Sequence, residues 1–525
     1  MAQLTLLLAL FAATVLLAPV ADRIRLPYPV LLLVLGLAVA YVPGLPTPSI
    51  EPDLILPLVL PPLLFAAARR TSWRQFLDNR RAIGLLAVAL VGVTAFSVAF
   101  ALQALVPGLP LLAAVALGAA VAPPDPVAAT AAARELRLPR RLRTTLEGEG
   151  LSNDATALVL YEVAVAGALT GSVSPWGAGS SLALSVVVGI AIGLVLAVSM
   201  RWLLTKLPAH PAGSALVLLI PFAAYGLADA AHGSGVLAVV TLALALSRYA
   251  DAESAQTRLV SETAWEIIEL LVTGAAFAFV GLELRAVASA VPGDLSSLIG
   301  QALVITALVI VVRFLWIFPV AALDQRLKAR RDPESEPVGW QERTIASWAG
   351  MRGVVTLAAV LALPADFPER DRLIFIAFVV IVVTLLLQGP SLPILVRRLG
   401  VHRSPDQEAH MEHELARRAR TAARGRLAEI GRDDDVDDDL TGEARRNLER
   451  IWRKVGFDEN AEPDPDEPAE GTPDTEHIWR VTDLEAEALT AAREAVVAAR
   501  AEPGMDPTVV DGVLRELDGH GVTLD

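Results

Sequence analysis

Long runs of apolar residues, separated by short stretches rich in charged residues, Pro and Gly, recur along the first 400 residues. Most of these runs are about 17–25 residues long, the length that a helix needs to cross ~30 Å of hydrocarbon. The pattern predicts an all-α polytopic membrane protein with about thirteen spans, near residues 3–20, 28–42, 53–68, 82–106, 110–133, 145–170, 179–204, 213–231, 234–248, 263–284, 296–322, 344–363 and 372–396. A soluble protein does not repeat helix-length apolar runs so often.

Basic residues alternate between the loops of this pattern. The loops that follow odd-numbered spans hold 21 Lys and Arg residues, whereas the intervening loops hold only Arg285, Arg370 and Arg372. Cytoplasmic loops of membrane proteins concentrate Lys and Arg. We therefore expect a multi-pass protein of the cytoplasmic membrane, with its N-terminus outside and its C-terminal tail inside.

The first run, Leu4 to Val20, lacks a basic start and is expected to be the first span rather than a signal peptide.

Composition separates the chain into two parts. The whole chain is 54% hydrophobic with a mean hydropathy of +0.52 and a net charge of −14. The acidity belongs to residues 401–525, which hold 16 basic and 32 acidic residues. We expect a transmembrane domain over 1–400 and an acidic, partly helical cytoplasmic tail over 401–525. Stretches such as Glu408 to Ile430 and Val481 to Ala501 favour helix, but acidic and Pro-rich segments between them cannot bury much apolar surface. The tail is therefore expected to be a solvated appendage, with a regulatory or oligomer-stabilising role as the alternative.

Several classes of function are excluded or disfavoured. The chain has no cysteine, which excludes disulfides, thiolate metal sites and cysteine nucleophiles. Neither part has the basic footprint of a nucleic-acid binder. The GxxxxGK[ST] loop of ATP-driven pumps and the HExxH and GxSxG signatures of hydrolases are missing. We expect a transporter driven by an ion gradient, not an enzyme, and no cofactor.

The first candidate site is a helix break around Asp125. Pro123, Pro124 and Pro126 surround this carboxylate in the segment LGAAVAPPDPVAATAAA, and prolines remove backbone donors and prevent a continuous helix. Unpaired backbone groups at membrane depth are tolerated only where they line a cavity or are buried in protein. Asp125 can offset the positive end of a half-helix. A proline kink with a paired, structural Asp is the alternative.

The second candidate is EGEGLSNDATALVLYE, residues 147–162, with Glu149, Asn153 and Asp154. Asp154 is expected ~13 Å deep at 1.5 Å per residue. An ionised carboxylate at this depth can coordinate a dehydrated cation, and its protonated form is neutral and releases that cation. A structural Asp bonded to Ser152 or Thr156 is the alternative.

The third candidate is SWAGMRGVVTLAAVL, where Gly350 and Gly353 flank Arg352. Glycines permit a break or close backbone approach. Arg352 is expected ~12 Å deep and to pair with a carboxylate at similar depth, Glu149 or Asp125. A second deep arginine, Arg313, is expected to form an ion pair with an unidentified partner. Secondary transporters place broken helices and ion sites near the bilayer midplane in this way.

With these motifs the chain resembles sodium/proton antiporters of the cation:proton antiporter-1 family. The resemblance covers about residues 1–400 and is carried by LPPLLF (60–65), the Asp125–Pro126 pair, GEGLSNDATALV (148–159), HGSGVLAVV (232–240), FVGLELR (279–285) and WAGMRGVVTLA (348–358). It implies a six-helix core domain with two crossed discontinuous helices, a dimerisation domain, a homodimer and elevator-like alternating access. It implies exchange of a monovalent cation, Na⁺ or else K⁺ or Li⁺, for H⁺, serving pH and cation homeostasis.

The resemblance also implies roles for the candidate residues. Asp154 is the Na⁺ or proton carboxylate, with Asn153 as its neutral neighbour. Glu149 and Arg352 form a supporting ion pair, and Asp125 compensates the broken-helix dipoles. The chain departs from the family pattern at Pro124, Gly150 and Ala66, where members commonly carry Thr, Ser and an acidic residue. With fewer side-chain oxygens, backbone carbonyls or water are expected to complete the cation's ligand shell, which leaves the ion preference open. A passive cation channel and a proton-coupled solute transporter are the competing functions.

Overall fold

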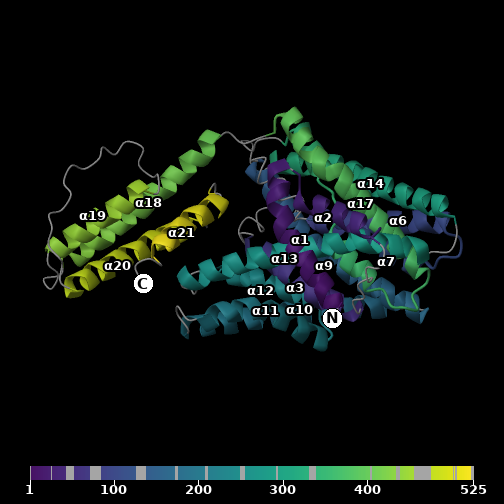
Figure 1. Cartoon of the computed structure of the whole chain (residues 1–525), viewed down its shortest axis with the longest axis horizontal. Coiled ribbons are helices and arrows are strands. Elements are labelled where there is room, and N and C mark those ends of the chain that lie inside the picture. Colours follow the sequence, from purple (N-terminus) through teal and green to yellow (C-terminus); the bar gives the residue numbers. More distant parts are fainter. Residues whose placement is uncertain are drawn as a thin grey trace. The chain divides into compact units, whose positions relative to one another are not determined.

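A computed structural model of the chain describes residues 2–24, 26–42, 52–70, 84–125, 138–171, 175–206, 211–248, 255–290, 294–329, 338–401, 405–432, 438–454, 475–499, 502, 505 and 507–521. All regular elements among these residues are helices (Figure 1). Contacts within the chain define two units. The first comprises 1–201, 217–248 and 264–402, and the second comprises 202–216, 249–263 and 403–525.

Helices occur in each of the predicted spans. They are α1 (Ala2–Ile24), α2 (Tyr28–Val39), α3 (Pro52–Arg70), the π-helix η1 (Leu85–Leu90) continuing into α6 (Val91–Leu105), α7 (Leu111–Val121), α9 (Arg140–Thr170), α10 (Pro175–Lys206), α11 (Pro211–Ala230), α12 (Gly235–Arg248), α13 (Ala255–Ala290), α14 (Leu295–Ala329), α15 (Trp340–Trp348), α16 (Val354–Leu361) and α17 (Arg370–Leu399). The predicted span 344–363 is divided into α15 and α16. The span 110–133 contains α7, and its residues 126–133 lie outside the described part of the chain.

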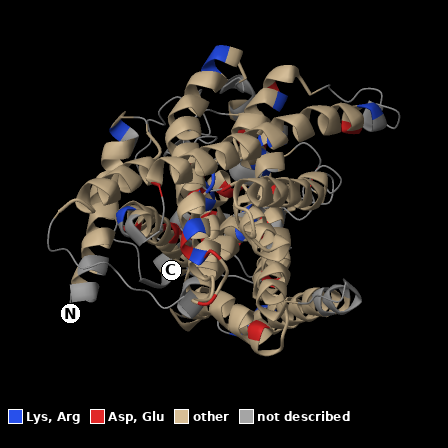
Figure 2. Cartoon of the chain, turned by 90° about the vertical axis from the view of Figure 1, so that its right-hand side faces the viewer, with Lys and Arg blue, Asp and Glu red and all other residues tan. Residues whose placement is uncertain are grey.

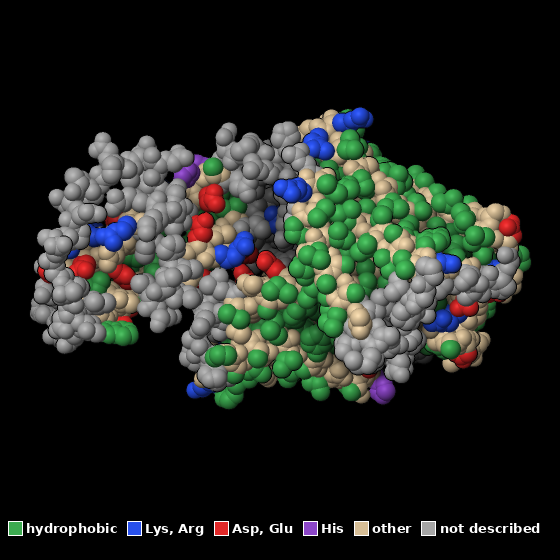
Figure 3. All heavy atoms as spheres, in the orientation of Figure 1, with side chains coloured by type: hydrophobic (Ala, Val, Ile, Leu, Met, Phe, Trp, Pro, Cys, Tyr) green, Lys and Arg blue, Asp and Glu red, His purple; other side chains and the backbone are tan. Residues whose placement is uncertain are grey.

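The outer surface of these helices is apolar. Within the described residues, six helical stretches are long and apolar enough to cross a membrane: Leu85–Leu105, Ala183–Lys206, Pro211–Ala230, Val260–Arg285, Leu295–Arg326 and Arg370–Leu399. Large hydrophobic side chains such as Leu184, Val195 and Leu315 are more than half exposed, and Figure 3 shows hydrophobic side chains covering much of the visible face of the first unit. Soluble monomers do not expose apolar patches of this extent. The fold is that of an integral membrane protein.

Charged residues are sparse along these helices, as Figure 2 shows, and a few of them are buried. Asp125, Glu149, Asp154, Arg313 and Arg352 are each less than a tenth exposed. They come from segments around α7, α9, α14 and the α15–α16 break. Helices α6, α7 and α9 pack against one another, and α14 and α17 pack together. Small residues let α7 approach its neighbours closely, because a Cβ at Gly118 would overlap the Ala95 carbonyl of α6.

Helices α18 (Pro405–Ile430), α19 (Asp438–Lys454), α20 (Thr475–Ala499) and α21 (Pro507–Gly521) form a packed group in the second unit. Apolar residues at four-residue spacing on α18 (Leu415, Ala419, Ala423 and Leu427) face a shared core with Trp452 of α19 and residues of α20 and α21. Arginines of α18 pair with acidic residues of other helices, for example Arg426 Nη2 with Glu487 Oε2 of α20 at 2.8 Å. The helices predicted in the tail are present, and they enclose a hydrophobic core. The acidic and Pro-rich segments that led to the expectation of a solvated appendage lie largely outside the described residues.

Candidate functional site

Two unwound segments meet inside the first unit. Helix α7 ends at Val121, and residues 122–125 continue without helical structure. The helix pair α15 and α16 is interrupted at 349–353. The N–H of Asp125 donates to the carbonyl of Met351 at 2.7 Å, which joins the two segments directly. The breaks predicted from the prolines and from Gly350 and Gly353 are observed here. Pro126 lies outside the described residues.

The side chain of Asp125 lies at the N-terminus of α16. Gly353 is the residue that precedes this helix, and a Cβ there would overlap the Asp125 carboxylate. Asp125 is 8% exposed. A carboxylate in this position offsets the partial positive charge of the first turn, where backbone N–H groups have no helical partners. Dipole compensation by Asp125 stays a prediction, and the position of its carboxylate supports it.

Arg352 binds backbone carbonyls instead of a carboxylate. Its Nε donates to Val121 O at 2.7 Å and its Nη2 to Ala122 O at 3.0 Å, and Nη1 donates to Gly350 O. Its backbone N–H donates to Thr384 Oγ1 at 3.1 Å. The last carbonyls of a helix have no partners within the helix, and a planar guanidinium can reach two of them at once. Arg352 therefore caps the C-terminal end of α7.

The predicted Glu149–Arg352 ion pair is wrong. The partner of Glu149 is Arg313 of α14: Nη2 lies 2.9 Å from Oε2, and Nη1 contacts Oε1. Both side chains are 2% exposed. Arg313 also donates from Nε and Nη2 to Ala346 O of α15, at 3.1 and 2.9 Å. The pair therefore connects α9, α14 and α15, and it supplies the partner that the sequence left unidentified for Arg313.

Asp154 and Asn153 are buried on α9, at 2% and 0% exposure. Asp154 lies on α9 and Asp125 follows the end of α7, and these two helices pack against each other. Both polar atoms of the Asn153 amide are buried without a hydrogen-bond partner in the described part of the chain. A buried polar group without a protein partner marks a place for water or an ion. Asp154, Asn153 Oδ1, Asp125 and nearby backbone carbonyls could together hold a dehydrated monovalent cation through oxygen.

Two further residues support the site and were not identified from the sequence. Tyr161 of α9 donates its hydroxyl to Ala359 O of α16 at 2.6 Å. Thr384 of α17 accepts the Arg352 N–H and donates to Val380 O at 2.7 Å. Both are uncharged, and no signal in the sequence separates them from the other polar residues of their spans. Their hydrogen bonds attach α16 to α9, and the break that precedes α16 to α17.

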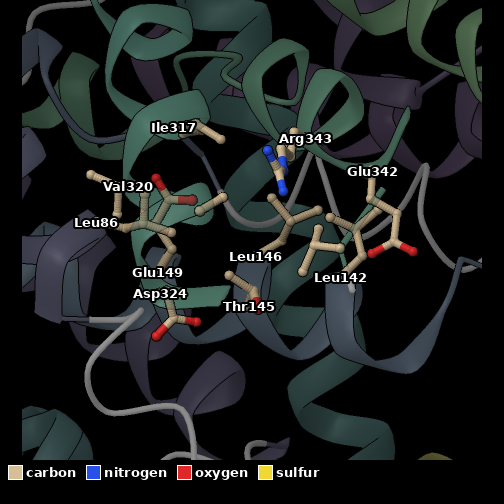
Figure 4. Close-up of a pocket in the computed structure, with 13 residues that line it drawn as sticks. Leu86, Leu142, Thr145, Leu146, Glu149, Ile317, Val320, Asp324, Glu342 and Arg343 are labelled. Carbon is tan, nitrogen blue, oxygen red and sulfur yellow. The ribbon is translucent and has the colours of Figure 1, made fainter. Parts of the chain in front are cut away.

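A cavity of about 80 Å³ reaches Glu149 between α9, α14 and α15 (Figure 4). Its wall is mostly apolar, with Leu86, Leu146 and Ile317 among the lining side chains. Asp324, Glu342 and Arg343 also line it. Glu149 is therefore the one buried carboxylate of the site that also borders this cavity.

Comparisons with known proteins bear on the family and the fold of the chain. The model of the family described as sodium/hydrogen exchanger, transmembrane, matches residues 8–398. An uncharacterised Na⁺/H⁺ exchanger of Mycobacterium tuberculosis is 35% identical over 466 residues, which cover 85% of this chain and 83% of that protein. The low-affinity Na⁺/H⁺ antiporter NhaS1 of Synechocystis is 30% identical, covering 79% and 77%. The solved sodium/proton antiporter MjNhaP1 of Methanocaldococcus jannaschii at pH 8 shares the fold, with a TM-score of 0.59 at 18% identity over 76% of this chain and 98% of that one.

Proposed function

Because this chain belongs to the sodium/hydrogen exchanger family, we propose that it is a secondary antiporter exchanging Na⁺ for H⁺ at Asp154. The observation that carries the proposal is the contact of two unwound segments beside buried carboxylates. Such breaks free backbone oxygens at membrane depth, and the adjacent carboxylate alternates between a cation and a proton. The test is Na⁺-driven proton flux in proteoliposomes, repeated with K⁺ and Li⁺. A chain that moves none of these cations against protons is not an antiporter.

Each group of the site has a separate task in this proposal. Asp154 carries the cation in its ionised form and the proton in its neutral form. Asn153 contributes an oxygen without titrating. Asp125 stays at the N-terminus of α16, and Arg352 stays on the C-terminal carbonyls of α7, so the opposite ends of the two broken helices are both neutralised. The Glu149–Arg313 pair is a fixed, neutral link between helices.

Exchange is electroneutral in this scheme, with one proton for one cation. Asp154 is the single group that changes its charge, because Asn153 cannot titrate and Glu149 is neutralised by Arg313. Transport then ignores the membrane potential, which supplies ~2.3 kcal/mol per charge per 100 mV to an electrogenic carrier. Flux measured with and without a valinomycin-imposed K⁺ potential tests the stoichiometry. A potential-dependent end-point would show that a second group titrates.

The chain is placed in the cytoplasmic membrane with its N-terminus outside and its tail inside. The support is the loop charge pattern of the sequence. The chain has no cysteine, so single cysteines report sidedness without background. His232→Cys, in the exposed turn between α11 and α12, should react with an impermeant maleimide from outside, and Thr421→Cys, exposed on α18, only after permeabilisation. The opposite result would invert the topology.

Transport is assigned to residues 1–400, and residues 401–525 are a separate cytoplasmic domain. The charged site residues all lie in the first part, and the tail has its own core. A chain ending after Val401 should still exchange ions. A correctly inserted truncation without flux would contradict this division.

The working unit is proposed to be a homodimer, which chemical cross-linking in membranes tests.

A further inference from the structure

Arg370, the first residue of α17, is a basic residue without an assigned role in exchange. It is one of only three Lys and Arg residues in the loops that the charge pattern places outside, where basic residues are rare. Its Nε donates to Leu363 O at 2.9 Å, and its Nη2 makes a longer contact with Leu361 O at 3.4 Å. Its Nη1 lies 3.6 Å from Asp371 Oδ1. The guanidinium of Arg370 therefore binds backbone carbonyls at the C-terminal end of α16.

Charged side chains lie at both ends of α16. The helix has only eight residues, Val354–Leu361, so it has few hydrogen bonds of its own, and contacts at its ends fix its position. The guanidinium at its C-terminal end satisfies carbonyls that lack helical partners and offsets their partial negative charge. The Asp125 carboxylate lies at the opposite end, against Gly353. This short helix is therefore held between an arginine and a carboxylate, each of the sign that its end favours.

Helix α16 is also bonded to α9, the helix that carries Asp154. Tyr161 of α9 donates to a carbonyl in the last turn of α16 at 2.6 Å. Toward the other end of α9, Glu149 binds Arg313, which in turn donates to a carbonyl of α15 at 3.1 Å. Asp154 lies between these two attachments along α9, and the break at 349–353 lies between them along the α15–α16 pair. The position of α16 therefore determines how the break lies along the part of α9 that carries Asp154.

We propose that Arg370 is a positioning residue for cation binding, which holds the C-terminal end of α16 and thereby fixes Asp125 and the 349–353 backbone at the other end of that helix. This rests on the proposed function, because cation binding at Asp154 is itself a proposal. The two ends of α16 are about 12 Å apart at 1.5 Å per residue, so a tilt at one end displaces the groups at the other. Displaced oxygen ligands bind a dehydrated cation less tightly, whereas the titrating carboxylate stays in place.

The test is Na⁺-driven proton flux in proteoliposomes containing Arg370→Met, which keeps the apolar stem and removes the guanidinium. The KM for Na⁺ should rise about fivefold through the lost charged hydrogen bonds. Turnover at saturating Na⁺ should stay within about twofold of the wild type, because Asp154 is unchanged. Arg370→Lys keeps the charge without the planar set of donors, so its KM should be intermediate. The direction of the change is informative, because a residue that only repelled Na⁺ at the outer surface would lower the KM when removed.

Arg372→Met is the matched control. Arg372 lies two residues further along α17, its side chain is 24% exposed against 26% for Arg370, and its Nη1 lies 3.2 Å from Glu369 Oε2. Its replacement should leave the KM unchanged.

An unchanged or lowered KM in Arg370→Met would overturn the proposal, and so would an equal rise in Arg372→Met. A loss of turnover without a rise in KM would also overturn it. If Arg370→Met does not insert, Arg370→Lys decides in its place, and a KM equal to that of the wild type contradicts the proposal. A wild type that exchanges no cation refutes the proposed function, whereas an active wild type with any of these contrary results refutes this inference alone.

Discussion

The carboxylate of Asp125 lies directly against the α-carbon of Gly353, in the space where any side chain at 353 would be. Gly353 has φ −141°, a backbone conformation that every residue can adopt. Glycine is required here because a larger side chain would overlap the Asp125 carboxylate. The contact places a negative charge at the N-terminus of α16 and closes the crossing of the two broken helices.

Gly353→Ala should therefore disrupt the crossing. A methyl group there forces Asp125 or the break to move, and overpacking of this kind costs about 1–3 kcal/mol of folding stability. Exchange should fall strongly, because the displaced carboxylate no longer faces the first turn of α16. Thermal unfolding and Na⁺-driven flux measure the two effects. Gly92→Ala in α6 is the matched control, because a Cβ at Gly92 meets no atom within 4 Å. Wild-type stability and flux in Gly353→Ala would contradict the contact.

The pairing of Glu149 with Arg313 can be tested by a double-mutant cycle. Glu149→Gln leaves a buried, uncompensated guanidinium and should cost about 3–5 kcal/mol. Arg313→Met should cost a similar amount, and the double variant much less than the sum. Thermal unfolding of the four proteins gives the coupling energy. The same cycle between Glu149→Gln and Arg352→Met should show a much smaller coupling, because Arg352 binds carbonyls. Additive effects for Glu149 and Arg313 would refute their pairing.

The tail should lose stability as the pH rises, through Glu485. This carboxyl group is 5% exposed on α20, and Asn447 Nδ2 donates to it at 2.6 Å. Burial raises the pKa of Glu485, and the nearby Glu443 raises it further, against the opposing effects of Asn447 and Arg450. Because the folded pKa exceeds the unfolded one, about 4.3, the contribution to stability is complete below that value. It is lost as the pH rises through the folded pKa.

Hydrogen exchange of α20 amides in the full chain measures this loss. Protection factors should decline from about pH 4.3 upward in the wild type, and Glu485→Gln should remove that part of the decline. Glu487→Gln is the control, because Glu487 is 54% exposed and bonded to Arg426. An unchanged pH dependence in Glu485→Gln would exclude this carboxyl group as its source.

The helix breaks could be predicted because their causes are local. The three prolines around Asp125 and the glycines beside Arg352 interrupt the helix within their own segments. Charged residues deep in apolar runs indicate a functional site because burying a charge in the membrane is costly. The ion pair could not be assigned in the same way. The sequence of a span predicts how deep each residue lies in the membrane, but not which neighbouring helix it faces. Arg313 and Arg352 both lie deep in their spans, so depth does not distinguish them as partners of Glu149. The order of helices around Glu149 decides between them, and that order is a property of packing.

The tail shows a second limit. Its acidic composition predicts a solvated chain, but many charges lie on outer helix faces and pair across helices, as Arg424 does with Glu449 at 2.8 Å. The Leu and Ala residues between them align at four-residue spacing on α18. The net charge of the tail gives no information on this alignment, whereas the helical periodicity of its apolar residues predicts it. Tyr161 and Thr384 were missed for a different reason, because an uncharged polar residue in a membrane span does not indicate which neighbouring helix it contacts.

The central claim is that Asp154 carries both the cation and the proton. The most direct measurement is the dequenching of a pH-sensitive dye in proteoliposomes after a Na⁺ pulse, for the wild type and for Asp154→Asn. The amide has nearly the same shape and cannot titrate, so the variant should insert and melt at least as high as the wild type. The wild type should dequench the dye, and Asp154→Asn should give the trace of protein-free liposomes. Dequenching by Asp154→Asn at a rate near that of the wild type would contradict the claim and remove Asp154 from the exchange.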